Sequence, residues 1–93
     1  MFIASIRLEL SIPYANSLKT KRMALRSIMD RVRDRFGAAV AEVDEQDTWQ
    51  RAVVGIALVS GEEHHVRDMA AKVVGFVEAN WEGEVCAIET EIL

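Results

Sequence analysis

Basic residues are concentrated in one segment of this sequence. The segment from Ser17 to Phe36 holds seven of the eleven lysines and arginines and only two acids, so its charge is +5 in a chain of net charge −4. On a helix, four of these bases fall within about 60° of one another: Lys19, Arg22, Arg26 and Arg33. Such a stripe suits contacts with phosphates. It also suits a solvated helix face on which Asp30 pairs with nearby arginines, and the sequence leaves both interpretations open.

Lys21 differs from these bases because its helical angle falls within the apolar arc. It must either extend its ammonium out to water or meet a carboxylate. An acidic run that includes Glu42, Asp44 and Asp47 supplies candidate partners, either within the chain or across an oligomer interface. The run lacks the glycine and the terminal glutamate of a calcium loop, so we predict no metal site.

The charge pattern gives two sets of candidate site residues. The candidates for anion or RNA contact are Lys19, Lys21, Arg22, Arg26 and Arg33. The candidates for an acidic counter-patch or interface are Glu42, Asp44, Asp47, Trp49 and Arg51. Trp49 follows a polar turn, where it could stack on a base or clamp the end of a hairpin.

Catalytic patterns are missing elsewhere in the sequence. His64 and His65 are adjacent, so on a helix they point about 100° apart and share a metal poorly. Cys86 lies in a strand pattern with no second cysteine, which favours an inert thiol and a reducing compartment. There is no glycine-rich phosphate loop, serine elbow or zinc spacing. We therefore predict a protein that is not an enzyme and needs no cofactor.

The hydrophobic patterns predict the elements that position these residues. Residues 2–12 alternate apolar and polar, which is typical of a strand. Ser17 as N-cap and Gly37 as left-handed C-cap bound a helix of about 18 residues. Strands are predicted over 38–45, 50–60 and 84–93, and a second helix from about 61 to 81.

The order β-α-β-β-α-β predicts an α+β, ferredoxin-like fold, in which two helices cover one face of a four-stranded antiparallel sheet. The whole chain, 1–93, forms one such domain. Because the middle strands are apolar on both faces, the uncovered face predicts a homodimer or higher oligomer, built through that face or a sheet edge. The residues predicted on this face are Val43, Val53, Ala57, Val59, Ile88 and Ile92.

The N-terminal segment alternates and is not a signal peptide, and no apolar run is long enough to cross a bilayer. We therefore expect a cytoplasmic protein with no membrane contact.

Two signatures in this chain are similar to those of a known family. Residues 17–22 (Ser-Leu-Lys-Thr-Lys-Arg) after a strand, then 41–44 and 46–52, resemble the bacterial YlxP-like family, a domain of unknown function. The resemblance spans essentially the whole chain and departs from the family only at Gly37, where an asparagine is more usual. It implies a ferredoxin-like fold, self-association and no established activity. Family members are often encoded near genes of translation initiation and ribosome maturation, which implies an accessory role with ribosomal RNA or a ribosomal component.

Overall fold

A computed structural model describes all residues, 1–93, and has the predicted order of elements. Alternating strands and capped helices begin and end within a residue or two of where the sequence patterns place them. The elements are β1 (Phe2–Ser11), α1 (Leu18–Phe36), β2 (Ala39–Asp44), β3 (Arg51–Ser60), α2 (Glu63–Asn80) and β4 (Glu84–Ile92).

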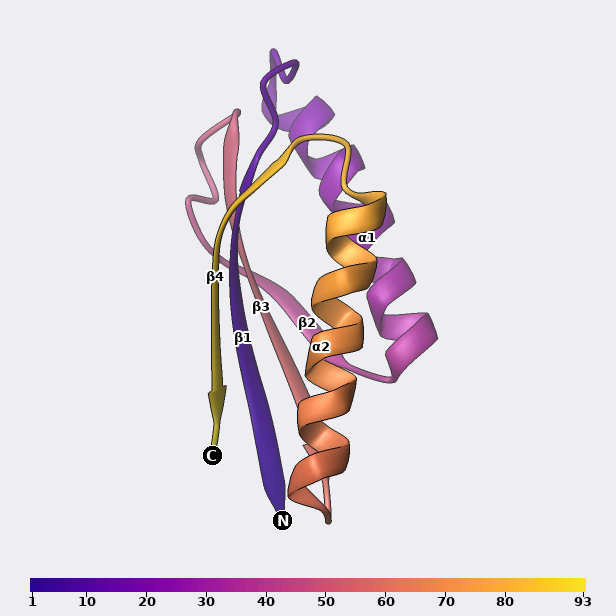
Figure 1. The fold of residues 1–93 in the computed structure, drawn as a ribbon. Coiled ribbons are helices and arrows are strands. Elements are labelled where there is room, and N and C mark those ends of the chain that lie inside the picture. Colours follow the sequence, from indigo (N-terminus) through magenta and orange to yellow (C-terminus); the bar gives the residue numbers. More distant parts are fainter.

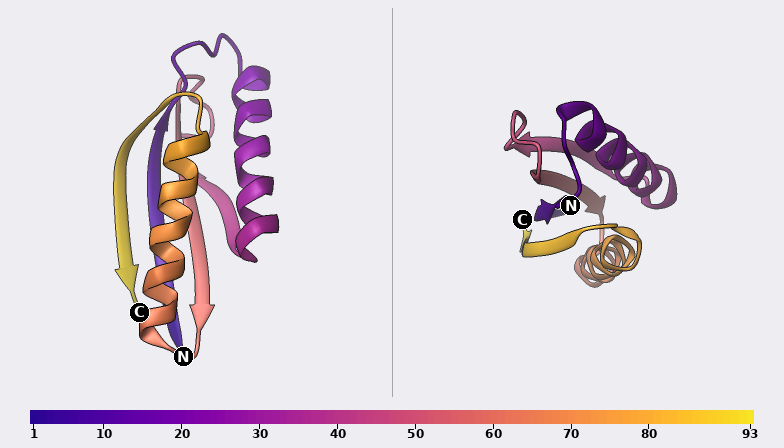
Figure 2. Two further views of the ribbon diagram at one scale, coloured as in Figure 1. Left: turned by 45° about the vertical axis from the view of Figure 1, so that its right-hand side comes forward. Right: turned by 90° about the horizontal axis from the view of Figure 1, so that it is seen from above.

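The four strands form one antiparallel sheet in the order β2-β3-β1-β4. Both helices lie on the same side of it, which Figure 1 shows edge-on and Figure 2 shows from two further directions. The predicted ferredoxin-like architecture is therefore confirmed. The chain ends lie close together, because Ile3 and Leu93 exchange both backbone hydrogen bonds, at 3.0 and 2.8 Å.

The caps of α1 are those that the sequence predicts. The Ser17 hydroxyl accepts a hydrogen bond from the Thr20 amide at 3.1 Å, which satisfies one of the free donors of the first turn. Gly37 ends the helix at φ 63°, in the left-handed region that glycine adopts without strain. Between the caps, Leu25, Ile28 and Val32 are buried against the sheet.

One hydrophobic core fills the space between the sheet and the helices. The even-numbered residues of β1 and β3 point into it, from Ala4 to Leu10 and from Ala52 to Leu58, and all of them are 3% exposed or less. Val66, Val73 and Val77 of α2 meet them from the other side. The odd-numbered residues of the same strands therefore face away from the helices.

The uncovered face differs in part from the prediction. Val43, Ala57 and Val59 lie on it, and the side chains of Val43 and Val59 are largely exposed, at 54% and 59%. Ile88 and Ile92 do not lie on it. They pair with Leu8 and Ala4 of β1, so they point to the helix side, and the prediction for these two residues was wrong. The sequence pattern of β4 separates its side chains into two alternating faces, but it does not show which of the two faces the helices.

Charged side chains also occupy part of this face. Arg7 contacts Glu9 at 2.9 Å and Asp44 at 3.8 Å, and Arg51 contacts Glu9 at 3.5 Å. Val53 has Glu9 and Asp44 as its cross-strand neighbours and is only 3% exposed among them. The free apolar surface is thus smaller than the sequence predicts, and it is centred on Val43, Ala57 and Val59.

Candidate functional site

The base that the sequence left without a partner, Lys21, lies inside the protein. Its side chain is fully buried, and its ammonium Nζ lies 2.9 Å from Oε2 of Glu42. No well-aligned hydrogen bond reaches this buried carboxylate oxygen, so the contact is an ion pair alone. The directional hydrogen bond of the ammonium goes to the backbone carbonyl of Glu45. The prediction of Lys21 as an anion contact is therefore corrected, because the chain's own hairpin occupies its ammonium.

The loop that receives Lys21 is held by local hydrogen bonds. Glu45 has a φ of 58°, and its amide donates to Oδ1 of Asp44 at 2.8 Å. Thr48 donates from its hydroxyl to the Glu45 carboxylate at 2.8 Å, and Gln46 donates to the Glu42 carbonyl at 3.1 Å. These bonds aim the Glu45 carbonyl at α1, and they fix the β2–β3 connection against the first turns of that helix.

The outer flank of α1 carries bases that no carboxylate neutralises. Lys19, Arg22 and Arg26 form no ion pair within the chain. Arg22 and Arg26 line a groove of about 390 Å³ between α1 and β2, over Leu25 and Met29. This groove is open to solvent along its length and holds Asp30 and Glu42 as its acids.

Arg33 belongs to the same groove but is already engaged. It donates to Asp30 at 2.8 Å and to the backbone carbonyl of Val40 at 2.7 Å. The predicted pairing of Asp30 with an arginine of this flank thus occurs with Arg33 and leaves Arg26 without an acid. The flank available to an anionic partner consists of Lys19, Arg22 and Arg26, and we call these three residues the basic flank.

The arginines on the opposite side of α1 join the two helices. Arg31 donates to the Asn80 side chain at 2.8 Å and lies 5.3 Å from the Phe76 ring centre. Arg35 lies over the same ring at 5.3 Å. These two bases stabilise the contact between α1 and α2, while the basic flank faces solvent on the β2 side.

The acidic counter-patch is dispersed by the fold. Glu42 pairs with Lys21, Asp44 pairs with Arg7, and Arg51 pairs with Glu9, all within one chain. Asp47 forms no ion pair, and Trp49 is 51% exposed at the hairpin end and lies outside the core. No group of three or more histidine, cysteine or acidic side chains is arranged to hold a metal ion. The structure thus brings these acids to the sheet and to Lys21, and none of them pairs with the basic flank.

Two features outside the basic flank were not predicted from the sequence. The Tyr14 hydroxyl donates to Glu82 at 2.7 Å; this bond, partial desolvation and the charge of Glu82 raise the pKa of the phenol above its usual 10.0. A second groove, between α2 and β4, is lined by Ala71, Gly75 and Ile88 among others. Small residues four apart on α2 were a sequence signal for it. The partner of Tyr14 is 68 residues away along the chain and gave no such signal.

The sequence model of the family DUF503, described as a protein of unknown function, matches residues 3–90. The chain belongs to this family. It is 38% identical over 77 residues to the uncharacterized protein YlxP of Bacillus subtilis (strain 168), covering 83% of this chain and 84% of that one. The resemblance found from residues 17–22 and 41–52 is therefore confirmed.

Solved structures agree on the fold of this DUF503 member. A de novo designed protein with a ferredoxin fold, determined by solution NMR, is similar with a TM-score of 0.57. It is 10% identical in sequence, and the match covers 99% of this chain and 85% of the designed one. At that identity the likeness concerns the fold alone. Neither helix of the structure has the length and apolarity that a membrane span needs.

Proposed function

We propose that this protein is a small, non-enzymatic cytoplasmic module that contacts RNA, on the ribosome or during its assembly, through the basic flank of α1. The observation that carries the proposal is the set Lys19, Arg22 and Arg26, which lies on one side of a rigid helix without any intramolecular ion pair. Phosphate contacts would neutralise these bases, which no carboxylate of the chain pairs with. The resemblance to a family encoded beside translation genes supports the same partner class.

Because Lys21 and Arg33 are engaged within the chain, three bases remain for phosphate contacts, and their number sets the expected salt dependence of binding. Three phosphate contacts predict a slope of about −2 to −3 for the logarithm of the binding constant against the logarithm of salt concentration. Between roughly 50 and 200 mM salt, the affinity should then fall about 15- to 60-fold. A module of this kind binds RNA weakly by itself, and a ribosomal component would add the specificity.

The test measures binding of purified ribosomal RNA and ribosomal subunits over a salt series by fluorescence anisotropy. The double reversal R22E/R26E should abolish low-salt binding while the circular dichroism spectrum and melting temperature stay unchanged, because both side chains are exposed. The matched control is R67E/K72E, which changes the net charge equally on exposed positions of α2. Equal loss in both variants, or wild-type binding without a salt slope, would overturn the proposal.

A second candidate function is self-association through the uncovered face of the sheet, where Val43 and Val59 are 54% and 59% exposed. The basic helix could also pair with the acidic hairpin of a second copy. Few acids of the hairpin are free for this, because Glu42 already pairs with Lys21 within the chain. The apolar contact is therefore the stronger basis for an oligomer. Sedimentation equilibrium tests it: V59E should give a monomer, and M23E, at an equally exposed methionine of α1, should leave the mass unchanged.

A further inference from the structure

The two edges of the sheet differ in how their backbone is protected. At the β2 edge, side chains occupy two outward carbonyls, since Arg33 donates to Val40 at 2.7 Å and Gln46 donates to Glu42 at 3.1 Å. A strand that approached this edge would have to displace both bonds. The β2 edge is therefore closed to strand addition.

The β4 edge has no such protection. Ile3 and Leu93 bond to each other through the backbone, so by alternation Glu89 and Glu91 also direct their backbone groups at β1. The amides and carbonyls of Ile88, Thr90 and Ile92 consequently point outward, and no side chain of the chain bonds to them. A row of unpaired donors and acceptors of this kind is a template for one more strand.

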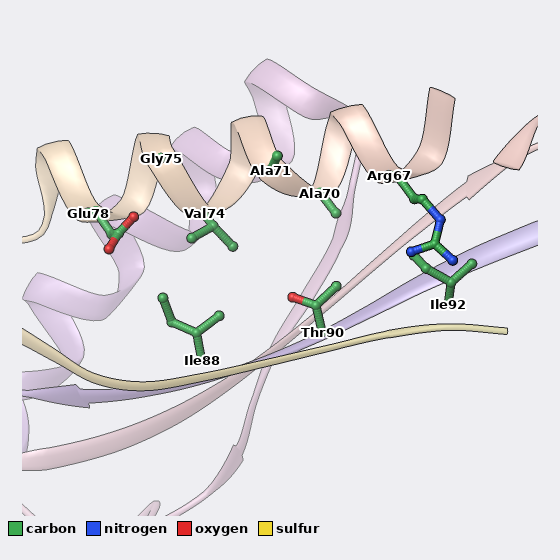
Figure 3. A pocket seen from close by; sticks show the side chains of 9 residues that line it. All are labelled: Arg67, Ala70, Ala71, Val74, Gly75, Glu78, Ile88, Thr90 and Ile92. Carbon is green, nitrogen blue, oxygen red and sulfur yellow. The ribbon is translucent and has the colours of Figure 1, made fainter. Parts of the chain in front are cut away.

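On the helix side of this edge there is a groove between β4 and α2. Helix α2 lies mainly over β1 and β3, and a space of about 370 Å³ remains between it and β4. Figure 3 shows Ile88, Thr90 and Ile92 rising from β4 toward α2, with the side chain of Val74 pointing toward Ile88. A Cβ at Gly75 would meet nothing within 4 Å, so the groove has room there for side chains from another chain.

The other side of the same edge is acidic. Glu89 and Glu91 alternate with the groove residues and are exposed on the face of the sheet away from the helices. Neither forms an ion pair within the chain. A strand paired to β4 would place alternate residues into the groove and the residues between them beside these carboxylates.

We propose that β4 and α2 together bind an extended segment of a partner protein as a fifth strand of the sheet. Its apolar side chains fill the groove beside Val74, Gly75 and Ile88, and lysines or arginines at the alternating positions meet Glu89 and Glu91. This is strand addition with a pocket for alternate side chains, a known mode of peptide recognition. A second copy of this chain is a poorer occupant, because an antiparallel pair of β4 strands centred on Thr90 sets Glu89 against Glu91. The surface lies on α2 and β4 and is independent of the basic flank.

The test uses a short synthetic peptide in which valine alternates with lysine. Isothermal titration should detect binding, and amide hydrogen exchange should slow at Ile88, Thr90 and Ile92, whose amides point outward, while Glu89 and Glu91 change little. A peptide of the same composition with its lysines grouped in one block should bind at least tenfold more weakly. An alternating valine–glutamate peptide should not bind.

Two variants separate the groove from the acids. Gly75→Leu adds a side chain at a position that lines the groove, where a Cβ meets nothing within 4 Å, and should weaken the valine–lysine peptide at least tenfold. Gly61→Leu, at an equally open glycine outside the groove, should not. E89K/E91K should weaken the same peptide about tenfold and allow the valine–glutamate peptide to bind. R22E/R26E should leave peptide binding unchanged.

Three outcomes would overturn the proposal. The first is no binding of the alternating peptide to the wild-type protein. The second is binding that is insensitive to Gly75→Leu. The third is protection of the outward amides without any peptide, together with a dimer mass, because β4 would then be paired with a second copy.

Discussion

The buried pair of Lys21 and Glu42 gives the sharpest test of how this fold is held together. Lys21 is fully buried, and its ammonium touches only the Glu42 carboxylate and the Glu45 carbonyl. The side chain of Glu42 retains 18% of its exposure, so the two partners differ in access to water. We therefore predict unequal costs for removing one or the other.

The predicted magnitudes follow from what each variant leaves behind. Glu42→Ala leaves a buried ammonium with one carbonyl partner, and a buried charge without its counterion costs about 3–5 kcal/mol. Lys21→Met keeps an apolar stem of similar length and leaves the Glu45 carbonyl without its donor, at about 1–3 kcal/mol. In that variant Glu42 can turn toward water. The double variant K21M/E42A should cost less than the sum of the two single variants, because neither group is left unpaired as a charge.

Urea unfolding followed by circular dichroism measures these free energies, and thermal melts provide a second scale. For a domain of this size, a loss of about 3 kcal/mol lowers the melting temperature by about 12–24 °C. A buried charge pair would be contradicted if Glu42→Ala cost less than about 1 kcal/mol, or if Lys21→Met cost more than Glu42→Ala. A double variant as unstable as the sum of the two would show that the residues act independently.

Two further predictions concern the end of the molecule where β1 ends and β4 begins. Gly83→Ala should lower the free energy of unfolding by about 2–3 kcal/mol, because the new methyl would lie 1.7 Å from the Ser11 carbonyl oxygen; Gly61→Ala, with nothing within 4 Å, should be close to neutral in urea unfolding. The pKa of Tyr14 should lie above 10.0 by ultraviolet absorbance, and Glu82→Ala should lower it toward that value, with the contribution of desolvation retained. Since the folded-state pKa is the higher one, the stabilisation by the neutral phenol is present below the unfolded-state pKa and is lost as pH rises through the folded-state pKa.

Local sequence patterns were sufficient to predict most of the fold. Alternation over residues 2–12 specified β1, and the caps Ser17 and Gly37 specified the ends of α1, because a strand face and a helix terminus depend on nearby residues. The order of the elements is compatible with only a few topologies. The observed one is the ferredoxin-like topology.

The candidate site was predictable only in part. Helical angles correctly separated Lys21 from the basic flank, because the angle of a residue on a helix is set by its position in the chain. They did not show that Arg33 would turn to the Val40 carbonyl and to Asp30, since that depends on where β2 packs against α1.

The sequence by itself determined that Lys21 needed a partner and that β4 had two alternating faces. Only the tertiary structure decided that the partner is Glu42, 21 residues away, and that Ile88 and Ile92 face the helices. Both decisions depend on the register between strands and on the packing of α1 over the β2–β3 loop. Periodicity shows which side chains share a face of an element, but it does not show which other element packs against that face.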